Sequence, residues 1–356
     1  MHLNDRNLRG FFGLARIGNR RVLPVLLLHV LMLLRAHVGT AYVRTLGIKS
    51  RVPIYWAESN CIFIRPHVTG YTPLNSDTEY AAVKRATENW NSEISDCSYM
   101  RFIYRNPENV RFTIDRNGVN DNVVYWVYAD WAKVDSVTEL ELRNPCASAV
   151  TLLTYSDRSD DPEVGRILHA RIELNADQSV KCNGISSPFS FATDGSAGKT
   201  DIENTLTHEL GHVLGIDHNC DEQREYYDAE LEANVPLPTP VDQDGNPVPL
   251  CASVASSSVI AKQTMFVSAN TGELSKRTIE SDDRQAMCDI YPIAEDPGEC
   301  NPVDLTPVES GGCHISALRA GDSKDSAPEA LGDRLAWTLI FAGLAFYYGL
   351  KYSSFL

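Results

Sequence analysis

The sequence predicts an α+β fold, and three observations lead to this expectation. Short apolar and aromatic runs in the first half of the chain are separated by turn-forming residues, which is typical of β-strands. Other segments repeat apolar residues at helical spacing. The chain has 356 residues, of which 43% are hydrophobic and 22% charged, so it is long enough to bury a sizeable core.

Five segments are expected to form strands: residues 52–66, 99–104, 123–128, 149–155 and 166–174. The run at 123–128 is continuously apolar and aromatic, which favours a buried central strand. In the last segment His169, Arg171 and Glu173 fall on one face, so we expect that face to contact water.

Three helices are expected along the chain. The first begins after Asp77, which can cap it, and runs to about Ile94. Its apolar positions are predicted to face the core: Ala81, Ala82, Val83, Ala86 and Trp90. The last is expected at about 281–290, where Asp282 and Asp283 in the first turn favour the helix dipole.

A helix between these two is marked at both ends. Thr200 and Glu203 have the spacing of a capping box, which satisfies free backbone N–H groups at a helix start. Gly215 is well placed to end the helix in the left-handed conformation. Four residues form one apolar stripe between these signals: Ile202, Leu206, Leu210 and Val213.

Three segments are expected to be irregular. Residues 183–198 are interrupted by Pro and Gly and are predicted to form a loop. Residues 220–263 form a longer irregular stretch with several prolines. Residues 293–334 are rich in Pro, Gly, Ser and acidic residues, which is typical of a disordered linker.

Residues 1–41 are predicted to be a signal peptide, so the protein is expected to be exported. A basic region ends at Arg21, and an apolar run follows at 22–34. Gly39 and Ala41 fit the −3 and −1 positions of a cleavage site, which makes Tyr42 the mature N-terminus. An uncleaved signal anchor is the alternative, and the paired arginines at 20–21 weakly suggest twin-arginine export.

Residues 335–351 are predicted to be a C-terminal hydrophobic anchor or sorting segment. The uncharged stretch 335–350 precedes Lys351, and its sixteen residues are marginal for a membrane span. The tail loosely resembles the sorting tails of bacterial surface proteins, which are processed or lipid-attached at a cysteine such as Cys313 here. A simple membrane anchor explains the same residues, so both interpretations stand. The protein is therefore expected to be secreted or attached to the cell surface.

Charge and cysteine content restrict the class of protein. The net charge of −15 argues against nucleic acid as a partner, because phosphate backbones are bound by Lys and Arg patches. Eight of the nine cysteines lie between residues 61 and 300 and suggest up to four disulfides in an oxidising compartment. Pairing of sequence neighbours is the simplest of 105 combinations. A cysteine metal site is not favoured, because the chain has no C-x-x-C pair.

The sequence HELGHVLGIDH, residues 208–218, predicts a catalytic metal site. His208 and His212 are four residues apart, so both imidazoles lie on one face of a helix and can bind one zinc ion. Gly215 turns the chain, and His218 is expected to return as the third ligand. Three protein ligands leave a position open for water, and Glu209 is expected to act as its general base.

This motif resembles the signature of the metzincin zinc metalloproteases and is most similar to the matrixin (matrix metalloprotease-like) branch. The resemblance covers roughly residues 52–292 and is strongest at 200–218 and 264–292. It implies a twisted, mixed five-stranded sheet, an active-site helix, a closing C-terminal helix and a methionine turn below the metal. The catalytic domain is accordingly expected at 42–292, with an insertion at 220–263.

Met265 is the candidate for the methionine turn. The stretch TIESDDRQAMCDIYP that follows resembles the closing helix of the family, which favours Met265 over Met287. An ordinary core methionine is the alternative. Val267 stands where the astacin and serralysin branches have an additional tyrosine ligand. Residues 165–175 resemble the edge strand that pairs with bound peptide in this family, and a plain core strand is the alternative.

The chain also departs from the matrixin pattern. No cysteine-switch propeptide is recognisable, so latency by that route is not expected. The 220–263 insertion could form a lid or reshape the substrate cleft. The structural zinc and calcium loops of animal matrixins are not recognisable either. Asp157, Asp160 and Asp161 are candidate calcium ligands, but an acidic solvated loop is the favoured interpretation.

Two functions of different classes fit these features. The favoured one is a zinc-dependent endopeptidase that acts on a protein or peptide substrate as a monomer, with membrane attachment through the C-terminal segment as an option. The alternative is a non-catalytic surface binding or adhesion protein that retains the fold. Glu209 favours the enzyme, because a non-catalytic relative is expected to lose the general base.

Overall fold

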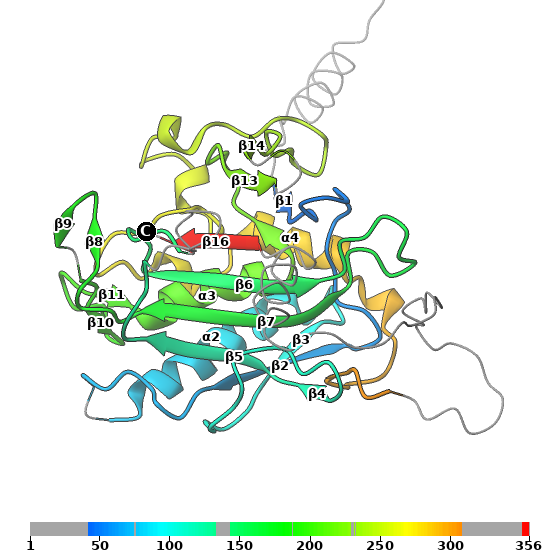
Figure 1. Ribbon diagram of the computed structural model, residues 1–356, viewed down its shortest axis with the longest axis horizontal. Coiled ribbons are helices and arrows are strands. Elements are labelled where there is room, and N and C mark those ends of the chain that lie inside the picture. The colour runs from blue at the N-terminus through cyan, green and yellow to red at the C-terminus, as the bar shows by residue number, and fades with distance from the viewer. Residues whose placement is uncertain are drawn as a thin grey trace, which may run out of the picture. The chain divides into compact units, whose positions relative to one another are not determined.

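The computed structural model describes residues 42–74, 76–132, 143–186, 188–228, 231, 233–307 and 351–355. Its largest element is a mixed β-sheet, seen in Figure 1, which lies against helices α2 and α3. The described strands of this sheet are ordered β16, β6, β7, β5, β2, β3. The chain is therefore a mixed α/β protein, compatible with the predicted α+β class.

Five strands of the sheet come from the five predicted segments: β2 (Cys61–Pro66), β3 (Arg101–Tyr104), β5 (Asn122–Val127), β6 (Ala149–Tyr155) and β7 (Ile167–Asn175). Strand β2 pairs parallel with both β3 and β5, and β5 pairs parallel with β7. Strand β6 runs antiparallel to β7 and makes the sheet mixed. A sixth strand, β16 (Lys351–Phe355), pairs antiparallel with the other side of β6.

Strand β7 is not the edge of the sheet, which corrects the role expected for residues 165–175. It pairs with β5 on one side and with β6 on the other, so its backbone groups are already engaged. The two outer strands of the five are β6 and β3, and β16 lies along the free side of β6. The sequence did not reveal this order, because β6 and β7 are both apolar and pairing order depends on the connection between them.

The expected wet face of β7 is also buried. Residues His169 and Glu173 are 4% and 2% exposed, and Glu173 forms ion pairs with Arg143 and Arg171. A small second hydrophobic cluster covers this face of the sheet: Val127, Trp131, Ala147, Val150, Leu152 and Val180. Buried charges are tolerated there because each has a partner of opposite sign.

The main core lies between the sheet and helices α2 (Thr78–Ile94), α3 (Ile202–Val213) and α4 (Ser281–Ile290). Ala82, Val83, Ala86 and Trp90 of α2 face it as predicted, whereas Ala81 is exposed. Trp90 Nε1 donates to the carbonyl of Thr207 at 2.8 Å and joins α2 to α3. The buried Tyr291, at the end of α4, donates its hydroxyl to the carbonyl of Leu214 at 3.1 Å. These contacts fix α3 from both sides.

The start of α3 differs from the predicted capping box. Asp201 is the N-cap, and its Oδ1 accepts a hydrogen bond from the backbone N–H of Asn204 at 2.9 Å. Thr200 pairs instead in β11 (Thr200–Asp201) with β10 (Phe191–Ala192). Glu203 forms ion pairs with Arg85 and Arg277. The predicted left-handed Gly215 is confirmed, with a φ of 88°.

Four disulfides link the described cysteines, and they correct half of the expected pairing. Cys146–Cys182 and Cys220–Cys251 join sequence neighbours as expected. Cys61–Cys300 and Cys97–Cys288 join residues 239 and 191 positions apart. The long-range pairs form because the closing segment of the chain returns to the start of β2 and the end of α2. Cys313 lies outside the described residues.

The segments around this core are short and local. β1 (Val43–Arg44) pairs with β12 (Ile216–Asp217), β4 (Val119–Asn120) with β15 (Val303–Asp304), and β8 (Lys181–Cys182) with β9 (Ile185–Ser186). The insertion contains a hairpin, β13 (Glu225–Asp228) with β14 (Ala233–Pro236), near the top of Figure 1. Single 3-10 turns occur at Cys251–Ser253, Ile260–Lys262, Ser275–Arg277 and Ile293–Glu295.

The folded part continues past the predicted boundary at residue 292. Cys300 is tied to Cys61, and β15 lies beyond it, so residues 293–307 pack on the domain instead of starting a linker. Within the described residues, no helix is long and apolar enough to cross a membrane. The predicted signal peptide at 1–41 and the apolar stretch at 335–350 lie outside the described residues.

Candidate metal centre

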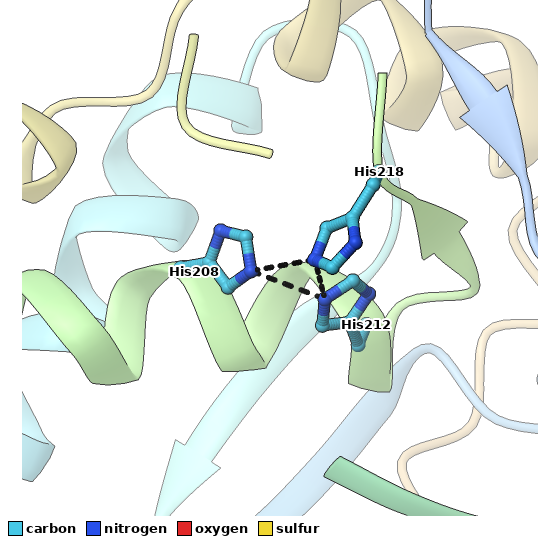
Figure 2. Close-up of side chains that lie close together, drawn as sticks. All are labelled: His208, His212 and His218. Atoms are coloured by element: carbon cyan, nitrogen blue, oxygen red, sulfur yellow. Dashed lines mark hydrogen bonds between the residues drawn. The ribbon is translucent and has the colours of Figure 1, made fainter. Parts of the chain in front are cut away.

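The three histidines of the motif meet in one buried site, as Figure 2 shows. The Nε2 atoms of His208, His212 and His218 lie 3.1–3.2 Å from one another. Helix α3 carries the first two rings on one face, and the turn at Gly215 brings the third ring back towards them. All three side chains are at most 2% exposed. Among the described residues, this is the group of His, Cys, Asp and Glu side chains that could hold a metal ion.

The outer nitrogen of each ring fixes its tautomer. His208 Nδ1 lies 2.7 Å from the carbonyl oxygen of Thr264, and His212 Nδ1 lies 2.8 Å from that of Ile216. His218 Nδ1 lies 2.6 Å from a carboxylate oxygen of Glu222. Because these oxygens only accept, each Nδ1 carries the proton and each Nε2 presents its lone pair. Three lone pairs therefore converge on one point, which suits a cation.

The size and chemistry of this group fit zinc. Nitrogen ligands lie 2.0–2.1 Å from zinc, so three of them on one face of a tetrahedron are about 3.3 Å apart. The separations of 3.1–3.2 Å come close to that value. Calcium and magnesium prefer oxygen ligands, so an all-imidazole set does not favour them. Burial and the neighbouring histidines hold the pKa of His208 well below its usual value, which keeps that ring neutral and able to bind a metal.

Glu209 is fully buried beside the histidines and has one engaged and one open oxygen. Its Oε2 accepts a hydrogen bond of 2.6 Å from Thr151 Oγ1, on β6. Its Oε1 has no hydrogen-bond partner among the described residues. Burial raises the pKa of Glu209 to about 8, although the bond from Thr151 opposes the shift. A cation at the histidines would lower this pKa, because a nearby positive charge stabilises the carboxylate.

Met265 packs beneath helix α3. A methyl group at Gly211 would lie 2.2 Å from Met265 Sδ, so the helix and the methionine are in close contact. The neighbouring carbonyl of Thr264 is the one that faces His208. Lys276, 1% exposed, donates from Nζ to the carbonyls of Gln263, Thr264 and Phe266 at 2.7–3.3 Å. The turn around Met265 is thus held by a buried ammonium group.

Asp217, Glu222 and Arg224 form a cluster of charged side chains around His218. Asp217 Oδ1 accepts from the backbone N–H of His218, and its Oδ2 accepts from Arg224 Nη2 at 2.8 Å. Burial opposes ionisation of Glu222, but His218 and Arg224 outweigh it and hold the pKa of Glu222 below its usual value. The Cys220–Cys251 disulfide ties this loop to the rest of the insertion.

The calcium candidates do not gather into a site. Asp157 accepts hydrogen bonds from the backbone N–H groups of Lys49 and Ser50, and so fixes the loop before β2. Asp160 pairs with Arg158. Asp161 accepts from the backbone N–H of Glu163. Each carboxylate is occupied by neighbouring protein groups.

The sequence predicted the three histidines, Glu209 and Met265, and the structure places the histidines together and Met265 against α3. The sequence did not predict the roles of Thr151, Glu222 and Lys276. Each of these residues contacts the site from another part of the chain, or from a position whose spacing matches no known motif. No protein-family description matches this sequence, and no curated protein matches it either.

Proposed function

We propose that this protein is a zinc-dependent endopeptidase of the metzincin type, most similar to the matrixin branch. The convergence of the three Nε2 lone pairs at 3.1–3.2 Å in a buried site carries the proposal. The mixed sheet, the turn at Gly215 and the position of Met265 under Gly211 support it, because they agree with the architecture that the motif implies.

His208, His212 and His218 would hold the metal, and Glu209 would move the proton. A bound zinc ion polarises a carbonyl group and lowers the pKa of water. The open Oε1 of Glu209 accepts the proton of the attacking water, and the same oxygen passes it to the leaving amine. Thr151 donates a hydrogen bond to Oε2, so the carboxylate keeps one orientation while Oε1 transfers the proton.

The cleft edge is expected at β6, because that strand supplies Thr151 and has its outer side away from β7. An extended peptide can pair with such an edge through backbone hydrogen bonds. In this structure β16 takes that position. We expect β16 and a bound substrate to exclude each other on β6.

The test uses the full chain, produced under oxidising conditions, with cleavage of an unfolded protein followed by gel and zinc measured by elemental analysis. Wild type is expected to hold about one zinc per chain and to cleave. Glu209→Gln should keep the zinc and lose roughly 10²–10⁴-fold in rate. Glu225→Gln, at an exposed position, is the matched control and should leave the rate unchanged.

The two functional hypotheses separate in this experiment. If the full chain and a chain that lacks residues 351–356 both hold zinc but cleave no unfolded protein, this would support the binding or adhesion protein and exclude the peptidase. A folded chain without zinc affinity would exclude both. Equal loss of rate in the Glu209 and Glu225 variants would show that Glu209 has no specific catalytic role.

A further inference from the structure

The three candidate metal ligands are not held alike. His208 and His212 each donate Nδ1–H to a backbone carbonyl, at 2.7 and 2.8 Å. His218 donates instead to a side-chain carboxylate, Glu222 Oε2, at 2.6 Å. An ionised acceptor draws the ring proton more strongly than a neutral carbonyl does, so the opposite nitrogen becomes a stronger electron donor.

Glu222 is itself held in place by its surroundings. Its side chain is 17% exposed, and Arg224 Nε lies 3.6 Å from the same Oε2. Arg224 also bonds Asp217, whose other oxygen accepts from the backbone of His218. Two further contacts fix the path of the loop between His218 and Glu222. Cys220 forms a disulfide with Cys251, and the backbone N–H of Asp221 donates to the carbonyl of Pro249.

We propose that Glu222 is a positioning residue for the metal centre, which orients His218 and strengthens its bond to the cation. The inference rests on the proposed zinc site but not on peptide cleavage. It assigns a role to the beginning of the 220–263 segment, where this chain departs from the matrixin pattern. Residue 222 reaches the ring because it lies four positions after His218 on a loop that turns back at Cys220.

The substitution Glu222→Gln separates charge from hydrogen bonding. A glutamine oxygen can still accept from His218 Nδ1, as the carbonyls do for the other two rings, but it carries no charge. Loss of an outer-shell partner of a metal-bound histidine lowers metal affinity about 10–100-fold. We expect Glu222→Gln near the lower end of that range and Glu222→Ala near the upper end. Glu225→Gln removes the same charge from an exposed position three residues away and should leave the affinity unchanged.

The experiment measures zinc affinity of the full, disulfide-bonded chain by competition with a chromophoric chelator at fixed pH. Urea unfolding of the metal-free variants shows whether the fold is retained. Visible absorption of the cobalt-loaded chains reports the strength of the ligands, which a purely structural role would leave unchanged. The expected result is weaker zinc binding and shifted cobalt bands in Glu222→Gln, with unfolding close to that of Glu225→Gln.

The outcomes are distinct. Equal zinc affinity and equal cobalt spectra in the Glu222→Gln and Glu225→Gln chains would overturn the inference. So would a loss of affinity that only accompanies loss of folding in the metal-free chain. Zinc binding with the expected difference, but without peptide cleavage by either the full chain or a chain that lacks residues 351–356, would overturn the proposed function and leave the inference standing. A wild-type chain that binds neither zinc nor cobalt would overturn both.

Discussion

Gly211 is the position where α3 comes closest to Met265, and replacing it tests this packing directly. A Cβ at Gly211 would lie 2.2 Å from Met265 Sδ, 3.0 Å from its Cε and 3.2 Å from Trp90 Cζ2. Ordinary van der Waals contact begins at 3.4 Å. The sulfur would therefore have to move, while Trp90 blocks part of the space and is itself bonded to Thr207.

The magnitude follows from two opposing effects. Alanine in place of glycine in a helix interior stabilises a protein by roughly 0.5–1 kcal/mol. Overpacking of a dense core costs about 1–3 kcal/mol. Because Met265 is 1% exposed and has little room to move, we expect the cost to dominate. Gly211→Ala should lower the free energy of unfolding by about 1–2 kcal/mol.

Equilibrium urea unfolding of the metal-free chain, followed by tryptophan fluorescence, measures this difference. Met265→Ala alone should cost about 2–5 kcal/mol, because it leaves a cavity. In the double variant Gly211→Ala/Met265→Ala the new methyl group occupies part of that cavity. The loss of unfolding free energy in the double variant should therefore be smaller than the sum of the two single losses by at least about 1 kcal/mol. Additive effects, within about 0.5 kcal/mol, would refute the contact between Gly211 and Met265.

Three further predictions test other parts of the structure. Lys276→Met leaves three buried carbonyls without their ammonium donor and should lower the unfolding free energy by about 3 kcal/mol in urea denaturation; the exposed Lys262→Met should change it by less than about 0.5 kcal/mol. Burial lowers the pKa of His169 from 6.5 to about 4, so the neutral ring stabilises the fold above pH 6.5, and this stability is lost as pH falls towards 4. Wild type should therefore lose about 3 kcal/mol more than His169→Asn between these pH values, and parallel stability curves would contradict this. Deletion of residues 351–356 should expose the outer edge of β6 and lower the KM for an unfolded substrate without changing kcat; an unchanged KM would show that substrate does not pair there.

Local sequence signals predicted the elements well. Strand β6 and helix α4 have the predicted bounds, because the largely apolar run of one and the acidic first turn of the other are local features. The predicted cap of α3 was one residue early: both Thr200 and Asp201 can cap, and the pairing of β11 with β10 decides between them. The prediction that one face of β7 contacts water was wrong. The polar residues of the strand do not reveal that Arg143 and Arg171 form ion pairs with Glu173.

The sequence by itself identified the three histidines, Glu209 and the turn at Gly215. Helical spacing and a left-handed glycine are enough to bring the three imidazole rings together. Only the tertiary structure decided which strand borders the candidate site, which distant cysteines pair, and which groups hold the candidate ligands and Glu209 in place. Thr151, Glu222 and Lys276 act across 58, 4 and 12 positions of sequence, on Glu209, His218 and Thr264. Such contacts depend on how the elements pack, since a hydrogen bond between separate segments leaves no periodic trace in the chain.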